Sequence, residues 1–131
     1  MKTTEWSHLP NAVHIDRVLA SVKAHPDVWG AARVAARFAD WSDARDAAWY
    51  AAKYATGDAA RIAARNAAWD AAKYAAGDAM VALIAWDDSA QYLDMTSEQL
   101  KMWYHLTERP ECLLLLPAVR AFERIEEMEM V

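Results

Sequence analysis

Alanine pairs recur every four residues between Trp29 and Met80, and this repeat constrains the fold more than any other feature of the chain. The stretch at 45–53, for example, reads Arg-Asp-Ala-Ala-Trp-Tyr-Ala-Ala-Lys. A period of twenty residues lies over the shorter one, because the motif at 49–54 returns at 69–74 with one change. Since alanine has the highest intrinsic helix propensity, the repeat predicts helices that carry small residues on one side.

One continuous helix does not fit this repeat. Four residues advance about 400° around a helix, so a strict period of four drifts by about 40° per group and the alanine stripe would circle the helix. Breaks are therefore expected at Gly57-Asp58 and Gly77-Asp78, because glycine suits the left-handed residue after a helix and aspartate caps the next one. The predicted helices lie near 27–39, 42–56, 58–76 and 78–93.

The N-terminal part of the chain predicts a tail and one further helix. Residues 1–9 read as an irregular tail. Asn11 is a favourable N-cap, so a helix is expected from there to about Lys23. This helix should end before Pro26, because the residue that precedes a proline avoids the α region.

The C-terminal part is richer in large apolar residues. The segment 80–86 is predicted to lie centrally in the core. Thr96-Ser97-Glu98-Gln99 has the pattern of a capping box, so a helix is expected from 96 to about Glu108. A last helix should begin near Glu111, with Pro117 either as a kink or in the true first turn.

These patterns predict an all-α fold, a compact bundle of about six to seven short antiparallel helices with the twenty-residue repeat of x-x-Ala-Ala groups at its centre. A single domain is expected to span 1–131, because a chain of 131 residues can bury a sufficient core. Its parts are the tail at 1–9, the Ala-rich helical repeat at 27–80 and the apolar C-terminal helices at 81–131.

Composition limits the cellular compartment and the classes of partner that we expect. A formal net charge of −5 is typical of a soluble protein and disfavours general nucleic-acid binding. The single cysteine, Cys112, excludes an internal disulfide and suits a reducing compartment. The longest apolar run, 113–119, is too short to span a bilayer, and the N-terminus has no apolar run like that of a signal peptide. A cytoplasmic protein without a membrane partner is expected.

Basic and aromatic residues occupy the first place of many four-residue groups, where neighbours meet at i and i+4. One interpretation is a nucleic-acid-binding stripe, in which cations bind phosphates and indoles stack on bases. This stripe comprises Arg33, Arg37, Arg45, Lys53, Arg61, Arg65, Lys73, Trp49 and Trp69. The other is a structural ladder of cation–π contacts and ion pairs. Seven Lys and Arg residues between 27 and 78 are matched by seven aspartates, which favours the ladder, because phosphate-binding surfaces carry a surplus of cations.

Acidic residues in the C-terminal half are the preferred candidates for contact with a basic protein partner. Asp87 and Asp88 are adjacent, and Asp94 follows six residues after the second. The last helix adds a Glu-rich surface. The predicted partner-binding set is Asp87, Asp88, Asp94, Glu123, Glu126 and Glu127.

The sequence offers little for catalysis or metal binding. His105 and Glu108 stand three residues apart on a predicted helix, but two ligands do not make a metal site. Cys112 precedes a run of leucines and has no companion motif, which indicates a buried, inert thiol. There is no Gly-rich phosphate loop and no Ser-His-Asp pattern. We therefore expect no catalytic residues, no metal and no cofactor.

The Ala-rich stretch at 45–53, together with the stretches at 82–88 and 113–119, resembles a class of small Ala-rich proteins from phages and other mobile elements. It also resembles the Ala-rich helical part of immunity proteins from toxin systems. The resemblance covers residues 30–120 and brings no catalytic residues with it. If a phage encodes the protein, the expected location is the host cytoplasm. It implies a small protein that neutralises another macromolecule, and targets in this class include nucleases, toxins and defence complexes, with anti-CRISPR proteins as one group.

The leading hypothesis from the sequence is a non-enzymatic protein that inhibits a host nuclease or defence complex by docking on its surface. Compactness, acidity and abundant tryptophan motivate it. Two alternatives stay open: a nucleic-acid-binding protein that uses the Arg/Lys-Trp stripe, and a structural protein that self-associates into a homo-oligomer.

Overall fold

A computed structural model describes residues 4–36, 43, 46–47, 50–51, 59–107 and 109–130. Within these ranges the chain forms six α-helices and one 3-10 helix and contains no strand, which confirms the predicted all-helical bundle. The elements are α1 (Ala12–Ala24), α2 (Pro26–Ala35), α4 (Ala59–Ala85), η1 (Ser89–Asp94), α5 (Ser97–Thr107), α6 (Pro110–Leu114) and α7 (Leu116–Glu129). Most of the helix predicted near 42–56 lies outside the described residues.

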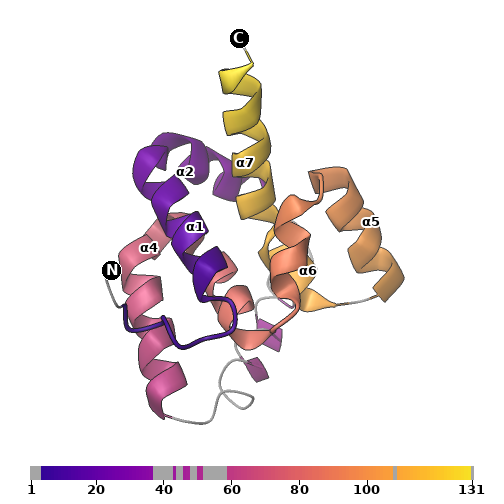
Figure 1. Cartoon of the computed structure of the whole chain (residues 1–131). Coiled ribbons are helices and arrows are strands. Elements are labelled where there is room, and N and C mark those ends of the chain that lie inside the picture. Colours follow the sequence, from indigo (N-terminus) through magenta and orange to yellow (C-terminus); the bar gives the residue numbers. More distant parts are fainter. Residues whose placement is uncertain are drawn as a thin grey trace.

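The helices pack around α4 and α7. Helix α1 lies along α4, and α2 packs mainly on α7 (Figure 1). Helix α5 lies on the side of the molecule away from α4 and contacts α6 and α7, and the C-terminal end of α7 projects beyond the other helices (Figure 1). This arrangement leaves α5 with a small share of the core.

The core is built from the apolar segment of α4 and the leucine run of α6 and α7. Residues 79–84 are all buried, which confirms that this segment lies centrally. Leu114, Leu115 and Leu116 are fully buried beside it. In the Ala-rich half of α4 the buried positions recur at steps of four, as the repeat predicts; they are Ala64, Ala68, Ala72 and Ala76. Side chains this small let neighbouring helices approach closely.

Trp29 joins three helices. Its side chain is fully buried in α2, and its indole Nε1 donates a hydrogen bond to Ser21 Oγ of α1 at 2.9 Å. Its ring meets the Phe122 ring of α7 edge to face, with centroids 5.4 Å apart. The large aromatic surface and the satisfied N–H make this residue the main link between the N-terminal helices and α7.

The predicted break near Gly77-Asp78 is present, because α4 consists of two helical segments joined across a kink, but the break lies slightly earlier than predicted. Gly77 and Asp78 follow the kink, and Gly77 has no positive φ. The helix is interrupted four residues earlier, where Lys73 has φ 36° and ψ −132°, and again at Ala76 with φ −128° and ψ 15°. Glycine is needed at 77 for a different reason, because a Cβ there would lie 2.7 Å from the Trp69 ring.

Asn11 stands at the predicted N-cap position of α1 but makes no side-chain capping bond there. Its amide nitrogen instead donates to the carbonyl oxygens of Leu83 at 2.5 Å and Trp86 at 2.7 Å. Leu83 lies in the last turn of α4 and Trp86 directly follows the helix, at an end where carbonyl groups have no partner within the helix. The buried Asn11 side chain therefore closes the C-terminus of α4 and ties the first helix to it.

The C-terminal helices begin where the sequence indicates. The capping box is confirmed, because the Gln99 N–H donates to Thr96 Oγ1 at 3.1 Å and the Thr96 N–H donates to Gln99 Oε1 at 3.0 Å. Of the two roles left open for Pro117, the structure shows a place in the first turn of α7. The helix expected from Glu111 is divided into α6 and α7 at Leu115.

Candidate functional site

The acidic residues after α4 are paired with cations from three separate parts of the chain. Asp94 lies 3.1 Å from Arg17 of α1, and Asp87 lies 3.6 Å from Arg61 of α4. Asp88 lies 2.8 Å from Arg109, which precedes α6. These three acids of the predicted partner-binding set are thus distributed among intramolecular ion pairs and do not form one patch of uncompensated charge.

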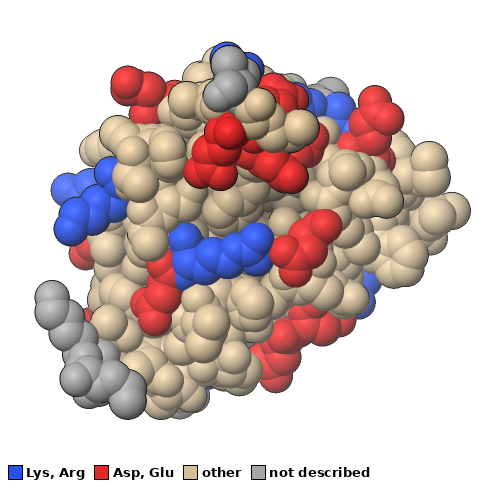
Figure 2. All heavy atoms as spheres, turned by 45° about the horizontal axis from the view of Figure 1, so that its top comes forward, with Lys and Arg blue, Asp and Glu red and all other residues tan. Residues whose placement is uncertain are grey.

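The acidic residues of α7 differ in their surroundings. Glu123 Oε1 accepts a hydrogen bond from the Ser97 N–H at 2.6 Å, so this carboxylate satisfies the N-terminus of α5. Glu127 lies 3.3 Å from Arg124 on the surface, and Glu126 is exposed. With the α7 end turned forward, acidic side chains gather near that end, while elsewhere on this face acids and cations lie side by side (Figure 2).

The Arg/Lys-Trp series does not form one stripe in the described residues. Arg61 pairs with Asp87, and Arg65 donates to Asn66 Oδ1 at 3.1 Å. Three other members come together, because Arg33 of α2 and Trp69 and Lys73 of α4 line one pocket with Asp70 and Tyr74. Arg37, Arg45, Lys53 and Trp49 lie outside the described residues.

Helix α5 exposes a group of apolar side chains that the sequence analysis did not single out. Met102, Trp103 and Leu106 have exposed fractions of 66%, 39% and 73%. Only Leu100 of this helix is buried, and Tyr104 is partly buried against the core. Positions 102 and 106, and 103 and 106, are neighbours on a helix surface, so the three side chains form one group, which we call the α5 apolar face.

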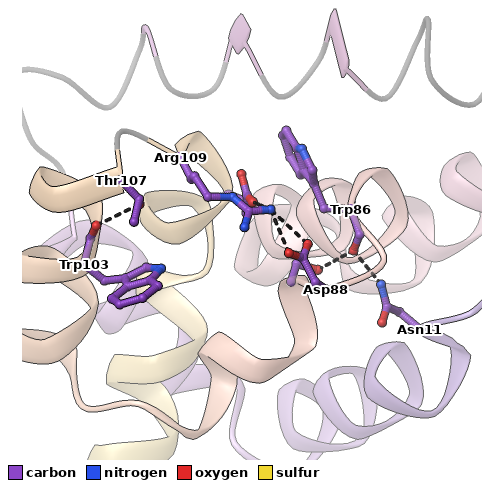
Figure 3. Close-up of polar contacts among 8 residues, drawn as sticks. Asn11, Trp86, Asp88, Trp103, Thr107 and Arg109 are labelled. Carbon is purple, nitrogen blue, oxygen red and sulfur yellow. Dashed lines mark hydrogen bonds and ion pairs between the residues drawn. The ribbon is translucent and has the colours of Figure 1, made fainter.

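A polar cluster, only part of which is buried, joins the ends of α4, α5 and α6. Arg109 forms an ion pair with Asp88, and the nearby Trp86 carbonyl accepts a hydrogen bond from the Asn11 amide (Figure 3). Arg109 Nη2 also lies 2.6 Å from Glu111 Oε1, so these two side chains form an ion pair. Burial raises the pKa of the Glu111 carboxyl above its usual value, and the Arg109 charge offsets only part of this rise.

Cys112 lies in the same cluster and is fully buried. Burial raises the pKa of its thiol from 9.0 to about 11, and the Glu111 charge adds to the rise. At neutral pH the side chain is therefore a protonated thiol, which is a weak nucleophile. This agrees with the inert thiol that the sequence indicates.

The raised pKa predicts a loss of stability in alkaline solution. The folded-state pKa of Cys112 lies above the unfolded value of 9.0. The contribution of this thiol to the free energy of unfolding is therefore fully present below pH 9.0 and is lost as the pH rises through about 11. Each pH unit in that window should lower the free energy of unfolding by about 1.4 kcal/mol relative to Cys112→Ala. Urea unfolding of both proteins across this window measures the difference. Equal pH dependence in the two proteins would contradict the prediction.

Among the described residues, no three His, Cys, Asp or Glu side chains are grouped closely enough to hold a metal ion. His105 is exposed on α5, and Glu108 lies outside the described residues. None of the described helices combines the length and apolarity that crossing a membrane requires.

Comparisons with protein-family models, with curated proteins and with solved structures find no match to this chain. The resemblance to Ala-rich phage and immunity proteins therefore stays a prediction. What the chain can bind has to be argued from the α5 apolar face, the pocket between α2 and α4, and the distribution of charge.

Proposed function

We propose that this protein is a non-enzymatic inhibitor that binds another protein and acts by covering its surface. The α5 apolar face carries the proposal, because it exposes Met102, Trp103 and Leu106 on one helix. Removing an apolar side chain of this size from water contributes about 1.5–3 kcal/mol. Tryptophan is also among the residues that dominate interface energetics. A partner with a complementary apolar groove would therefore gain a compact anchor from this helix.

The charge of the chain supports one kind of partner. With a net charge of −5, two copies of this protein repel one another, whereas a protein with a basic surface is attracted. Nucleases and nucleic-acid-binding complexes carry such surfaces, because they neutralise phosphates with Lys and Arg. We therefore propose a nuclease or nucleic-acid-binding defence complex as the target, which corresponds to an anti-defence or immunity role such as that of anti-CRISPR proteins.

In this proposal the acidic residues guide the approach and the α5 apolar face provides the anchor. Asp87, Asp88 and Asp94 already lie beside cations of their own chain, so separating them would cost part of what docking gains. Their charges, with those of Glu126 and Glu127, still contribute to the long-range field that accelerates encounter with a basic partner.

The test compares two double variants in affinity capture from the natural host, with nuclease added to remove nucleic-acid bridges. Met102→Ser with Leu106→Ser removes most of the α5 apolar face without touching a buried side chain. Val13→Ser with Met130→Ser is the matched control, because both of these residues are apolar and exposed but lie outside α5. We expect the α5 variant to bind the captured protein at least about 30-fold more weakly, which corresponds to about 2 kcal/mol, and the control to bind normally.

Two results would overturn the proposal. One is equal capture of the partner by the α5 variant and the control. The other is recovery of the protein itself as the main companion, with a mass in light scattering that rises with concentration, which would instead support the self-associating alternative.

A further inference from the structure

A pocket of about 360 Å³ opens beside the break in α4. Arg33 from α2 lines one part of it, and Trp69, Asp70, Lys73 and Tyr74 from α4 line the rest. Two cations and one carboxylate give the pocket a net positive charge on a chain whose overall charge is −5. Two aromatic side chains stand in the same lining. The pocket therefore joins a phosphate-binding group of charges to surfaces on which a base can stack.

The backbone at this place departs from the helix. Lys73 has φ 36°, a left-handed conformation that a residue with a side chain rarely adopts. Tyr74 directly follows Lys73, and the Arg33 guanidinium donates to the Tyr74 carbonyl oxygen. Strained conformations of this kind persist where the surrounding structure holds them, and they are concentrated at binding sites.

The position of the Trp69 ring is determined by Gly77. A Cβ at position 77 would lie 2.7–2.8 Å from three atoms of that ring, so the absence of a side chain there allows the ring to pack against the backbone. Trp69 also packs against the hydrophobic core. The ring is thereby a fixed wall of the pocket, which lowers the side-chain entropy that the protein loses when a base stacks on it.

We propose that this pocket binds one nucleotide unit. Its phosphate would lie between Arg33 and Lys73, and its base would stack on Trp69 or Tyr74. A guanidinium has five N–H donors, so the bond from Arg33 to the Tyr74 carbonyl leaves donors for a phosphate oxygen. Asp70 supplies an acceptor for a sugar hydroxyl or an exocyclic amine. The volume lies in the range of small-ligand pockets.

This proposal is independent of the inhibitor role. Two kinds of ligand contain such a nucleotide unit. The unit is either a free mononucleotide or a nucleotide within a single strand of DNA or RNA. Calorimetric titration of the full chain with adenosine monophosphate, with a short single-stranded oligonucleotide, with adenosine and with inorganic phosphate distinguishes them. Equal affinity for the mononucleotide and the oligonucleotide assigns a free nucleotide, whereas a preference for the strand that weakens steeply with salt assigns a nucleic acid.

Two variants test the pocket residues without removing buried groups. Lys73→Gln removes a cation and Tyr74→Ala removes a stacking surface, and both side chains are exposed. Lys23→Gln is the matched control, because Lys23 is an exposed lysine in the last turn of α1. We expect each pocket variant to weaken binding about 10-fold while its thermal unfolding stays unchanged, and the control to bind as the unchanged protein does. Absence of binding to both the nucleotide and the oligonucleotide at millimolar concentration, or equal binding by the pocket variants and the control, would overturn the proposal.

Discussion

Trp29→Ala lowers the free energy of unfolding by about 3–5 kcal/mol, the range for removing a fully buried tryptophan. The change removes the ring that packs on Phe122 of α7 and the N–H that bonds to Ser21 of α1. It also leaves a cavity where α2 meets both helices. Because domains of this size are stable by only about 5–15 kcal/mol, the variant should unfold at much lower urea concentration.

Two smaller substitutions divide this effect into its parts. Ser21→Ala leaves the indole N–H without its acceptor and should cost about 1–3 kcal/mol. Trp29→Phe keeps an aromatic ring near Phe122 and should be less destabilising than Trp29→Ala. An unfolding midpoint of Trp29→Ala equal to that of the unchanged protein would mean that α2 does not pack on α7 as described.

We expect the second large loss of stability from Arg109→Met. It removes the cation that lies 2.6 Å from Glu111, whose side chain is only 1% exposed. Leaving a buried charge without its partner costs about 3–5 kcal/mol, and the partial exposure of Arg109 places this variant near the lower limit. The measurement is urea unfolding at neutral pH.

The pH dependence of the free energy of unfolding shows whether the unpaired Glu111 charge causes this loss of stability. The folded-state pKa of Glu111 lies above its ordinary value of 4.5, so its contribution to stability is fully present below pH 4.5 and is lost as the pH rises through the raised pKa. Without Arg109 this pKa should rise further, and the cost of Arg109→Met should shrink in acid as the carboxyl becomes neutral. Adding Glu111→Gln should restore much of the stability.

A matched control separates the buried pair from a surface pair. Arg124→Met breaks the exposed pair with Glu127, which should cost less than about 1 kcal/mol. If Arg109→Met is no more destabilising than Arg124→Met at neutral pH, the buried carboxylate does not depend on Arg109 for its charge compensation.

Local sequence patterns were sufficient to predict most helix starts. The capping box at Thr96 and Gln99 depends on residues three apart, and proline at 26 fits the first turn of a helix. The alanine repeat correctly predicted small buried residues at steps of four in α4. These features succeed because their causes lie within a few residues of one another.

Contacts between distant parts of the chain explain the failures. Gly77 was predicted to be the left-handed residue after a helix, whereas it has no positive φ and leaves space for the Trp69 ring. The break spans Lys73 to Ala76, directly before this glycine, and its positive φ falls on Lys73, a residue type with no preference for that conformation. Asn11 has the chemistry of an N-cap, but its amide bonds to carbonyls more than seventy residues away. None of these partners is visible in a local pattern.

The candidate surfaces were predicted only in part. Charge counting indicated that aspartates match the cations of the repeat, but could not show that Asp87, Asp88 and Asp94 pair with three separate arginines. The α5 apolar face had a signal in the sequence, because Leu100 and Tyr104 share one helical face while Met102 and Leu106 share another. Packing decides which of these two sides of the helix is turned toward the core. The structure shows that it is the side with Leu100, which is buried.

Amide hydrogen exchange of the purified protein, free and bound to the partner recovered by capture, tests the central claim most directly. A docked helix opens less often, so its amides exchange more slowly. The proposal predicts that partner binding slows exchange most strongly in α5, across 97–107, and leaves α1 little changed. Slower exchange confined to α1 or to the pocket between α2 and α4, with α5 unchanged, would contradict it.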